Sequence, residues 1–177
     1  MCGEECLNRL SMFECGPWNC RAAGCTNRVM QRSNRLKKYL QVFETERTGM
    51  GVRCSVQIPK DTFVVEYVGE YISKEKYEEV NGNRLDTYFF QTVPGYGIDA
   101  RRYGNVSRFV NHSCEDPNLN AQRWVINGIV RIGLFSRRSI KRAEELVFSY
   151  GAPVLQCKCK SCFEKNLTKS DKNGNIQ

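Results

Sequence analysis

Ten cysteines are the residues in this 177-residue chain whose spacing points most clearly to chemistry. Eight of them form two clusters near the ends of the chain, and only Cys54 and Cys114 lie in the long stretch between them. The first cluster comprises Cys2, Cys6, Cys15, Cys20 and Cys25, and the second comprises Cys157, Cys159 and Cys162. Thiol clusters that flank a cysteine-poor body are typical of two metal-bound caps on one conventional core.

Zinc is the metal that we expect at these thiols, because a structural zinc ion takes four cysteine or histidine ligands in a tetrahedron. The second cluster supplies three thiols, so its fourth ligand must come from elsewhere, and Cys114 is the candidate. Cys54 lies in a run of strand-forming residues, which favours a small buried side chain there. Disulfide bonds are the alternative, but they belong to secreted proteins and nothing in the sequence indicates secretion.

The remaining chemistry of the chain does not fit the common hydrolases or kinases. The chain has one histidine, His112, and neither a G-x-S-x-G segment nor a phosphate-binding loop. A lone histidine is more often packed or hydrogen-bonded than catalytic. Zinc binding is therefore the one function that the residue types indicate before the sequence is compared with known protein families.

Composition places the chain among folded, intracellular proteins. Hydrophobic residues make up 41% and charged residues 26% of the sequence, and no apolar run approaches the roughly 18 residues that span a membrane. The formal net charge is +8, but eight thiolates that bind two zinc ions would lower it to about +4. This mild charge does not by itself indicate direct DNA recognition.

Short strands are expected to position these residues. Segments rich in β-branched and aromatic side chains, which favour strands, are residues 39–45, 62–72, 86–92 and 146–150. Asn127-Gly128 between two apolar runs predicts a β-hairpin, because both positions of such a turn need positive φ. Ser73 predicts the N-cap of a short helix through Val80, and residues 49–51 predict a tight turn. The body is therefore expected to be mostly β.

Four motifs in this body resemble those of SET-domain methyltransferases. Residues 108–114 (R-F-V-N-H-S-C), followed by Pro117-Asn118, resemble the family's R-F-x-N-H-S-C-x-P-N segment. Residues 66–70 resemble its E-Y-x-G-E segment, residues 49–51 its G-x-G turn, and residues 146–150 its final L-T-F-D-Y strand. A lone G-x-G is weak evidence, but four motifs in the family's order are highly specific.

Both ends of the chain also resemble modules that flank SET domains. The first cysteine cluster is similar to an AWS zinc module, and residues 122–128 (Q-R-W-V-I-N-G) are similar to the Q-K-W-x-V-N-G run of the branch that acts mainly on lysine 36 of histone H3. The last cluster resembles a post-SET zinc cap. The resemblance implies four parts: an AWS-like module truncated at its N-terminus (1–28), a SET domain (29–151), a post-SET cap (152–167) and a disordered tail (168–177).

The resemblance further implies a mostly β SET fold of small sheets, in which the C-terminal segment passes through an earlier loop as a pseudoknot. Residues expected to form the catalytic lysine channel are Tyr67, Tyr88, Phe148 and Tyr150, with Tyr150 as the catalytic tyrosine. Residues expected to bind S-adenosyl-L-methionine are Thr48, Gly49, Met50, Tyr88, Asn111 and His112. Arg108 is expected to support the cofactor loop, and Phe89 and Phe90 are expected to pack in the core.

The chain departs from the family's pattern at its caps. The AWS module normally has a further C-x-C pair before the position of Cys2, so only the site of Cys2, Cys15, Cys20 and Cys25 is expected to be complete, and Cys6 belongs to an incomplete one. The last cluster reads C-x-C-x2-C instead of C-x-C-x4-C, which makes Cys162 the least secure ligand. Met50 replaces the usual tryptophan of the G-W-G turn. These differences concern the caps and the cofactor loop, not the class of reaction.

We therefore expect a histone lysine N-methyltransferase that adds at least two methyl groups, with lysine 36 of histone H3 as the expected target. A nuclear, chromatin-associated and monomeric catalytic domain follows from the resemblance, with a histone tail or nucleosome as partner, no sequence-specific DNA binding and no membrane. Three alternatives stay open: another histone or non-histone lysine as target, an inactive SET-like histone-binding module, and a zinc-based nucleic-acid binder.

Overall fold

The fold is described by a computed structural model, which covers residues 2–3, 5–32, 35–82, 88–151 and 157–165. Its strands are β1 (Leu40–Glu44), β2 (Met50–Cys54), β3 (Phe63–Tyr67), β4 (Glu70–Ser73), β5 (Phe89–Val93), β6 (Tyr96–Asp99), β7 (Asn111–His112), β8 (Leu119–Ile126), β9 (Ile129–Ser136) and β10 (Glu145–Phe148). The labelled α-helices are α1 (Leu7–Leu10), α2 (Val29–Arg32) and α3 (Lys74–Asn81), residues 160–165 are also helical, and 3-10 turns cover Lys37–Tyr39 and Val106–Phe109. The prediction of a mostly β body is confirmed.

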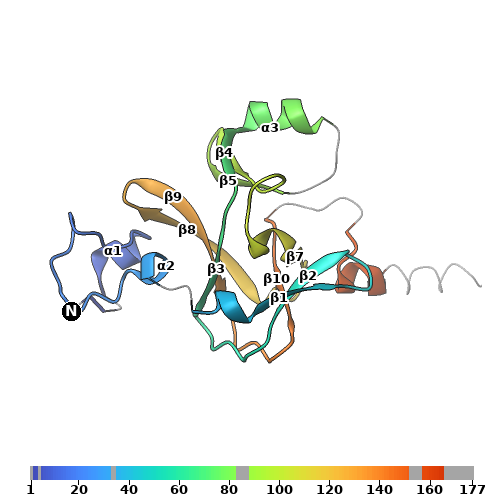
Figure 1. The fold of residues 1–177 in the computed structure, drawn as a ribbon, viewed down its shortest axis with the longest axis horizontal. Coiled ribbons are helices and arrows are strands. Elements are labelled where there is room, and N and C mark those ends of the chain that lie inside the picture. The colour runs from blue at the N-terminus through green and yellow to red at the C-terminus, as the bar shows by residue number, and fades with distance from the viewer. Residues whose placement is uncertain (1, 4, 33–34, 83–87, 152–156, 166–177) are drawn as a thin grey trace, which may run out of the picture.

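The strands form two sheets (Figure 1). The larger sheet has the order β1-β2-β10-β8-β9-β3, with β7 paired to β10 at one side, and the smaller sheet has the order β4-β6-β5. The polypeptide after β3 enters the smaller sheet, which carries α3, before it returns to the larger one. Segments far apart in the sequence therefore meet at the centre of the larger sheet.

The β8–β9 hairpin confirms the prediction made from Asn127-Gly128. Eight residue pairs join the two strands, from Leu119 opposite Ser136 to Ile126 opposite Ile129. The two turn residues have φ of 51° and 80°, the left-handed values that asparagine and glycine adopt at least cost. This hairpin connects β10 on one side to β3 on the other.

The helix predicted after Ser73 is present as α3. The Ser73 hydroxyl accepts a hydrogen bond from the backbone N–H of Lys76 at 3.1 Å, which satisfies one of the unpaired donors of the first turn. The helix ends at Asn81, one residue beyond the predicted end, where Gly82 has a φ of 56°. The cap therefore follows the local sequence as expected.

Two expectations on local structure are wrong. Residues 62–72 do not form one strand, because Val68 and Gly69 separate β3 from β4 in the other sheet. Gly69 lies so close to the backbone carbonyl of Asp99 that a β-carbon would collide with it, and the chain bends there. The tight turn lies at residues 45–49 instead of 49–51: the N–H of Thr45 donates to the carbonyl of Gly49 at 2.7 Å, and Gly51 already belongs to β2.

Residues from both halves of the chain make up the main hydrophobic core, which includes Val52, Ile58, Val110, Leu119 and Leu146. Cys54 lies within it and is 0% exposed, so the expectation of a buried, hydrophobe-like cysteine is confirmed. The core connects β2, β8 and β10, the strands on which the candidate site is built. No helix among the described residues has the length and apolar character of a membrane span.

The C-terminal strand β10 lies inside the sheet, not at its edge. It pairs antiparallel with β2 and parallel with β7 and β8, so the last strand enters between elements formed earlier. This arrangement is the core of the expected SET pseudoknot. It places the residues after Phe148 beside Asn111 and His112, which are almost forty positions earlier in the sequence.

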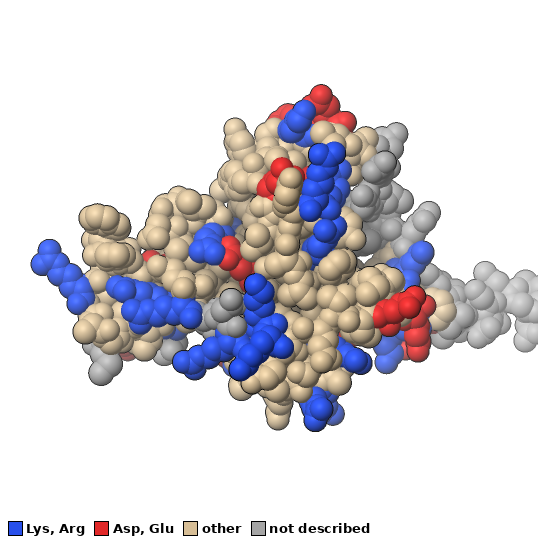
Figure 2. Space-filling model, in the orientation of Figure 1, with Lys and Arg blue, Asp and Glu red and all other residues tan. Residues whose placement is uncertain are grey.

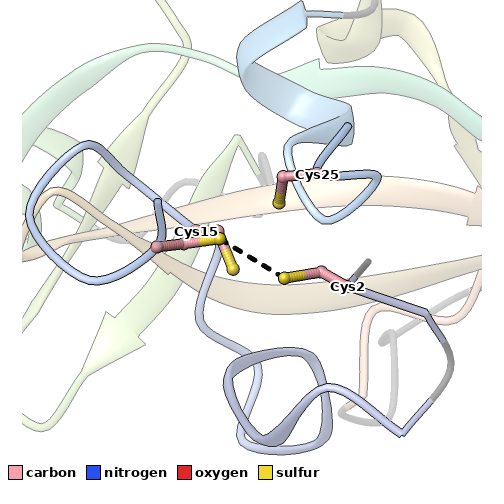
Figure 3. Close-up of side chains that lie close together, drawn as sticks. Cys2, Cys15 and Cys25 are labelled. Atoms are coloured by element: carbon pink, nitrogen blue, oxygen red, sulfur yellow. Dashed lines mark hydrogen bonds between the residues drawn. The ribbon is translucent and has the colours of Figure 1, made fainter. Parts of the chain in front are cut away.

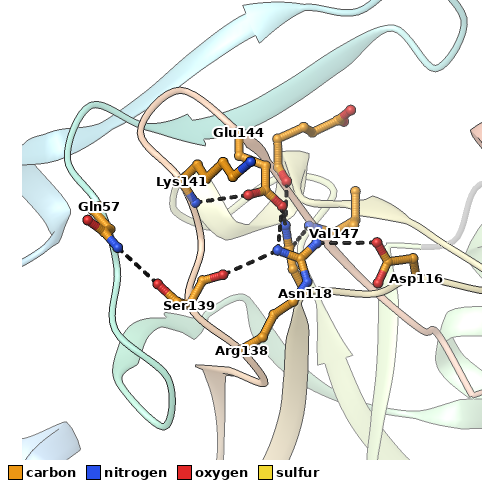
Figure 4. Close-up of polar contacts among 9 residues, drawn as sticks. Gln57, Asp116, Asn118, Arg138, Ser139, Lys141, Glu144 and Val147 are labelled. Carbon is orange, nitrogen blue, oxygen red and sulfur yellow. Dashed lines mark hydrogen bonds and ion pairs between the residues drawn. The ribbon is translucent and has the colours of Figure 1, made fainter.

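Asn118, which follows Pro117 in the motif, holds β10 in this position (Figure 4). Its side chain is 1% exposed. The carboxamide oxygen accepts the N–H of Val147 at 2.9 Å, and the carboxamide nitrogen donates to the carbonyl of Glu145 at 2.7 Å and to the carboxylate of Glu144 at 3.0 Å. Arg138 forms an ion pair with the same carboxylate at 2.8 Å. The side chain of Asn118 thus serves as the hydrogen-bond partner of two backbone groups of β10, the carbonyl of Glu145 and the N–H of Val147.

The cysteine-rich N-terminal part is joined to the hairpin by backbone contacts. The N–H of Glu14 donates to the carbonyl of Val125 at 3.0 Å, and the N–H of Val125 donates to the carbonyl of Met12 at 2.8 Å. The buried carboxylate of Glu14 accepts the N–H groups of Met30 at 2.5 Å and Gln31 at 3.2 Å, at the start of α2. These contacts fix the first cysteine cluster relative to β8.

Candidate functional site

The first cysteine cluster contains a compact group of four thiols. The sulfur atoms of Cys2, Cys15, Cys20 and Cys25 all lie within 4.8 Å of one another, and three of them point toward one another in Figure 3. Sulfur atoms around a tetrahedral zinc ion are about 3.8 Å apart, as follows from zinc–sulfur bonds of about 2.3 Å. The donor set therefore fits a structural zinc ion.

Two amide groups prepare Cys15 for this role. Asn8 and Asn27 donate hydrogen bonds to its sulfur at 3.3 and 3.4 Å. Burial opposes ionisation of this thiol, but the two donors outweigh it and lower the pKa of Cys15 to about 6. A thiolate is the form that binds zinc. Cys6, the fifth thiol of the cluster, lies 3.9 Å from the sulfur of Cys15 and outside the group of four.

The C-terminal cluster forms a second group of four thiols with Cys114. The sulfur atoms of Cys114, Cys157, Cys159 and Cys162 lie within 4.8 Å of one another, and Cys114 is 3.7 Å from Cys157 and 3.5 Å from Cys162. The short C-x2-C spacing therefore still brings Cys162 to the group. Burial opposes ionisation of Cys159, but a hydrogen bond with Ser161 helps to lower its pKa to about 6.

Aromatic side chains from three strands or their ends (β3, β5 and β10) lie close together. The rings of Phe148 and Tyr150 are 4.8 Å apart, and the hydroxyl of Tyr150 donates to the carbonyl of Val110 at 3.0 Å. The hydroxyl of Tyr67 donates to the carbonyl of Tyr88 at 2.9 Å. The structure thus brings Tyr67 and Tyr88 together on one side and Phe148 and Tyr150 on the other.

Phe90 joins these two pairs, and the sequence analysis assigned it to core packing alone. Its ring lies 5.6 Å from that of Tyr67 and 6.2 Å from that of Phe148, and the side chain is only partly buried. The guanidinium of Arg123 lies 5.9 Å from the Phe90 ring and donates to the carbonyls of Gln91 and Thr92. The alternation of β5, which directs Phe90 to the side opposite Phe89, is the signal that could have identified it.

Burial keeps the Tyr67 hydroxyl neutral. It raises the pKa of Tyr67 well above the ordinary value, and the proximity of Tyr150 raises it further. A neutral phenol can donate one hydrogen bond and accept another without carrying charge. The walls of this aromatic group are therefore apolar, with the hydroxyls of two tyrosines as polar points.

An open cleft of about 1010 Å³ reaches from residues 43–48 past Asn111 and His112 to residues 158–161 near the C-terminal thiols. Thr48, Asn111 and His112 line it, whereas Gly49, Met50 and Tyr88 are not among the described residues that do. The carboxamide of Asn111 donates to the carbonyl of Met50 at 3.1 Å and to the carboxylate of Glu145 at 2.9 Å. Asn111 therefore ties the 45–50 loop to β10.

Gly51 lies close to this tie. A β-carbon there would lie 2.7 Å from the Thr45 methyl carbon and 2.8 Å from the Glu145 carboxylate, so these side chains would have to move to admit it. Tyr88 lies apart from the loop, beneath the guanidinium of Arg108 at 5.2 Å. Arg108 also donates to the carbonyl of Arg101 at 2.7 Å, so it supports the aromatic side of the site instead of the loop.

His112 lies between the cleft, the aromatic group and the C-terminal thiols. Its Nδ1 atom accepts the backbone N–H of Tyr150 at 3.1 Å, and its Nε2 atom lies 3.1 Å from the sulfur of Cys114. Burial lowers the pKa of the imidazole. Both ring nitrogens are thus engaged within the protein, so a molecule in the cleft would contact the His112 backbone or the ring face.

Comparison with family models identifies two matches. The SET domain model matches residues 49–151, and the AWS domain model matches residues 1–33. The first match contains the aromatic group, the 49–51 segment, Asn111 and His112. The second contains all five cysteines of the first cluster.

Similar proteins carry the same activity in their names. Histone-lysine N-methyltransferase Set2 of Drosophila melanogaster is 39% identical over 170 residues, which are 90% of this chain and 7% of that protein. Human histone-lysine N-methyltransferase SETD2 is 38% identical over 170 residues, 90% of this chain and 6% of that protein. A Schizosaccharomyces pombe protein named histone-lysine N-methyltransferase, H3 lysine-36 specific, is 37% identical over 169 residues, 89% of this chain and 21% of that protein. The chain spans only a small part of these relatives.

Proposed function

The chain belongs to the SET-domain family, and we propose that it is an S-adenosyl-L-methionine-dependent protein lysine N-methyltransferase. The observation that carries the proposal is the aromatic group of Tyr67, Phe90, Phe148 and Tyr150, whose Tyr150 ring lies 5.0 Å from that of His112 in the segment that lines the cleft. We assign the aromatic group to the substrate lysine side chain and the cleft to the cofactor.

The aromatic walls would favour the reactive form of lysine. A lysine amine has an unperturbed pKa near 10.4, so only about a thousandth of it is neutral at pH 7.4. Exclusion of water by aromatic rings disfavours the ammonium form and lowers the amine pKa. The same walls restrict the direction from which the amine approaches.

Tyr150 is the residue that we assign to the reacting centre. S-adenosyl-L-methionine supplies, when bound, the methyl group that the amine attacks. The hydroxyl of Tyr150, fixed by its bond to the carbonyl of Val110, would orient the amine and support the charge that develops, without covalent participation. The tie from Asn111 to the 45–50 loop, with Thr48 in that loop, would hold the cofactor cleft in shape.

Histone H3 is the substrate that we propose, with lysine 36 as the target residue. The names of the similar proteins support this choice, and so does the AWS match at the N-terminus. Figure 2 shows Lys and Arg side chains across the whole face, with Asp and Glu in smaller groups, one of them over α3. A positive face favours approach to a nucleosome, whose DNA is negative, without base recognition. A nuclear, chromatin-bound location follows from this substrate.

Two structural zinc ions complete the proposal. One would be held by Cys2, Cys15, Cys20 and Cys25, and the other by Cys114, Cys157, Cys159 and Cys162. The second group joins the C-terminal residues to the motif strand, beside the cleft. Zinc there would serve to hold the cap over the cleft, because a site with four thiolates leaves no position for a substrate.

Transfer of a labelled methyl group to histone H3 peptides tests the proposed function. We expect transfer from S-adenosyl-L-methionine to a peptide that contains lysine 36, and no transfer to the same peptide with arginine at that position. Calorimetry with S-adenosyl-L-methionine controls for a competent cofactor cleft. A zinc-loaded protein that binds the cofactor but methylates no histone would contradict the proposal and favour a histone-binding module.

A further inference from the structure

A single imidazole connects the C-terminal thiol cluster to the catalytic tyrosine. His112 is the last residue of β7, and it pairs with Phe148, the last residue of β10. The ladder continues for one more bond, from the N–H of Ser113 to the carbonyl of Phe148 at 3.1 Å. The N–H of Tyr150 is bonded to the His112 side chain instead, at 3.1 Å. The imidazole therefore takes the place of a backbone acceptor where the strand pairing ends.

This bond determines which ring nitrogen carries the proton. A backbone N–H can only donate, so the Nδ1 atom of His112 must be the unprotonated acceptor. A neutral imidazole with a free Nδ1 carries its proton on Nε2. The Nε2 atom lies 3.1 Å from the sulfur of Cys114, so its N–H faces the atom that would be a thiolate in a zinc-bound cap. Hydrogen bonds from such donors orient metal-bound ligands and adjust their basicity.

Cys114 connects this imidazole to the cap. Its sulfur lies 3.7 Å from that of Cys157 and 3.5 Å from that of Cys162, residues that come from the end of the chain. On the other side, the His112 and Tyr150 rings are 5.0 Å apart in a tilted arrangement. A metal ion that draws the four thiols together would thus fix Cys114, then His112, and then the backbone that carries Tyr150.

We propose that His112 is a positioning residue that couples assembly of the C-terminal zinc cap to the placement of Tyr150. The coupling rests on the proposed function in that it takes the cap as a zinc site and Tyr150 as the catalytic tyrosine. Its consequence is that Tyr150 reaches its final position only in a protein with an assembled cap. A chain without the cap would keep its sheet but hold this tyrosine loosely.

Two substitutions separate the two hydrogen bonds. In H112N, the shorter amide places its oxygen near the former Nδ1 position and can still accept the N–H of Tyr150, but it does not reach Cys114. In H112Q, the longer amide brings its nitrogen near the former Nε2 position and can still donate to Cys114, but position 112 no longer offers an acceptor to the N–H of Tyr150. Only histidine makes both bonds at once.

Cadmium-113 NMR of the cadmium-substituted protein tests the hydrogen bond between His112 and Cys114 of the cap. We expect two signals in the unmodified protein, one for each group of four thiols. H112N should shift the signal of the C-terminal site, because the thiolate loses a donor, while H112Q leaves it near its original position. The signal of the N-terminal site is the internal control and should stay unchanged in both variants.

Amide hydrogen exchange of Tyr150 tests the second hydrogen bond, from the N–H of Tyr150 to His112. Loss of its acceptor in H112Q should speed exchange on the order of tenfold, the effect of one hydrogen bond. Cys162→Ser, which removes a cap ligand, should speed exchange of the Tyr150 amide when His112 is present. In H112N the same substitution should have little further effect, because the hydrogen bond to Cys114 is already lost. This loss of additivity is what a merely structural histidine would not produce.

Three results would overturn the coupling. They are an unchanged cadmium signal of the C-terminal site in H112N, an exchange rate of the Tyr150 amide that Cys162→Ser does not change, or a single cadmium signal in the unmodified protein. None of these measurements depends on turnover. A protein that transfers no methyl group would therefore contradict the proposed function, while the cadmium and amide signals still decide the coupling.

Discussion

Replacement of Asn118 by alanine should destabilise the protein strongly, because this buried side chain makes three hydrogen bonds to the β10 region. Alanine leaves the N–H of Val147 and the carbonyl of Glu145 without their partner, and it removes a donor from the Glu144 carboxylate. A buried polar group that loses its partner costs about 1–3 kcal/mol. At about 1.5 kcal/mol for each of the two backbone groups left without a partner, the expected loss in unfolding free energy is about 3 kcal/mol.

Urea unfolding followed by circular dichroism, with zinc present throughout, measures this loss. The midpoint should fall while the slope of free energy against urea stays unchanged, which marks a change in stability and not in the size of the unfolding unit. In a thermal scan the same loss corresponds to a decrease in Tm of about 6–12 °C for a chain of this size. Turnover should fall as well, because β10 carries Phe148 and leads into Tyr150.

Asn120→Ala is the matched control. Asn120 lies two residues further along, in β8, but its side chain is exposed, so its loss should cost less than about 0.5 kcal/mol. If Asn118→Ala cost no more than this control, the contacts of Asn118 would not hold β10, and the role assigned to Asn118 would be wrong.

The remaining predictions concern the site. Tyr150→Phe should lower kcat on the order of a hundredfold, because it deletes one preorganised hydroxyl and keeps the ring; near-normal turnover in a folded variant would remove Tyr150 from the mechanism. The unmodified enzyme should add at least two methyl groups, because Phe148 has no hydroxyl to hold a water beside the amine, and Phe148→Tyr should shift the products toward monomethyl-lysine; an unmodified enzyme that stops at one methyl with excess cofactor would contradict this. Metal analysis should find two zinc ions per chain, and fewer than one would refute the two-cap arrangement. Removal of the C-terminal zinc should lower activity more than the unfolding free energy, because that cap borders the cleft and lies outside the core.

Features that depend on neighbouring residues could be predicted from the sequence. Asn127-Gly128 predicts the hairpin because only a few residue types adopt its two φ values, and Ser73 predicts a helix start because its hydroxyl serves the adjacent turn. The cysteines could be grouped because a zinc ion needs four ligands and Cys114 was the candidate left for the second group. The structure places the thiols of each group together, and zinc binding itself stays a prediction.

Features that depend on distant residues could not be predicted in the same way. The break between β3 and β4 arises because Gly69 lies against the backbone of Asp99 in β6, a contact that strand composition does not reveal. Phe90 packs against the core as predicted, but its contacts with Tyr67 and Phe148, which also place it in the aromatic group, could not be predicted from its residue type. The predicted disordered tail and the segment after Gly151 lie largely outside the described residues.

The SET motifs supplied most of what was known of the site in advance. They placed Asn111 and His112 near Tyr150, and the structure shows why: β7 pairs with β10 in parallel. They did not show that both ring nitrogens of His112 have partners, or that the side chain of Asn118 accepts the N–H of Val147. These contacts of His112 and Asn118 form where the strand pairing ends, so the motif residues alone do not predict them.

Mass spectrometry of recombinant nucleosomes, after incubation with the zinc-loaded protein and S-adenosyl-L-methionine, tests the central claim most directly. We predict dimethylation or trimethylation of lysine 36 of histone H3, lost with Tyr150→Phe and absent when that lysine is replaced by arginine. Methylation confined to another lysine would contradict the proposed substrate. The absence of any methylated histone, with a protein that binds the cofactor and two zinc ions, would contradict the proposed activity itself.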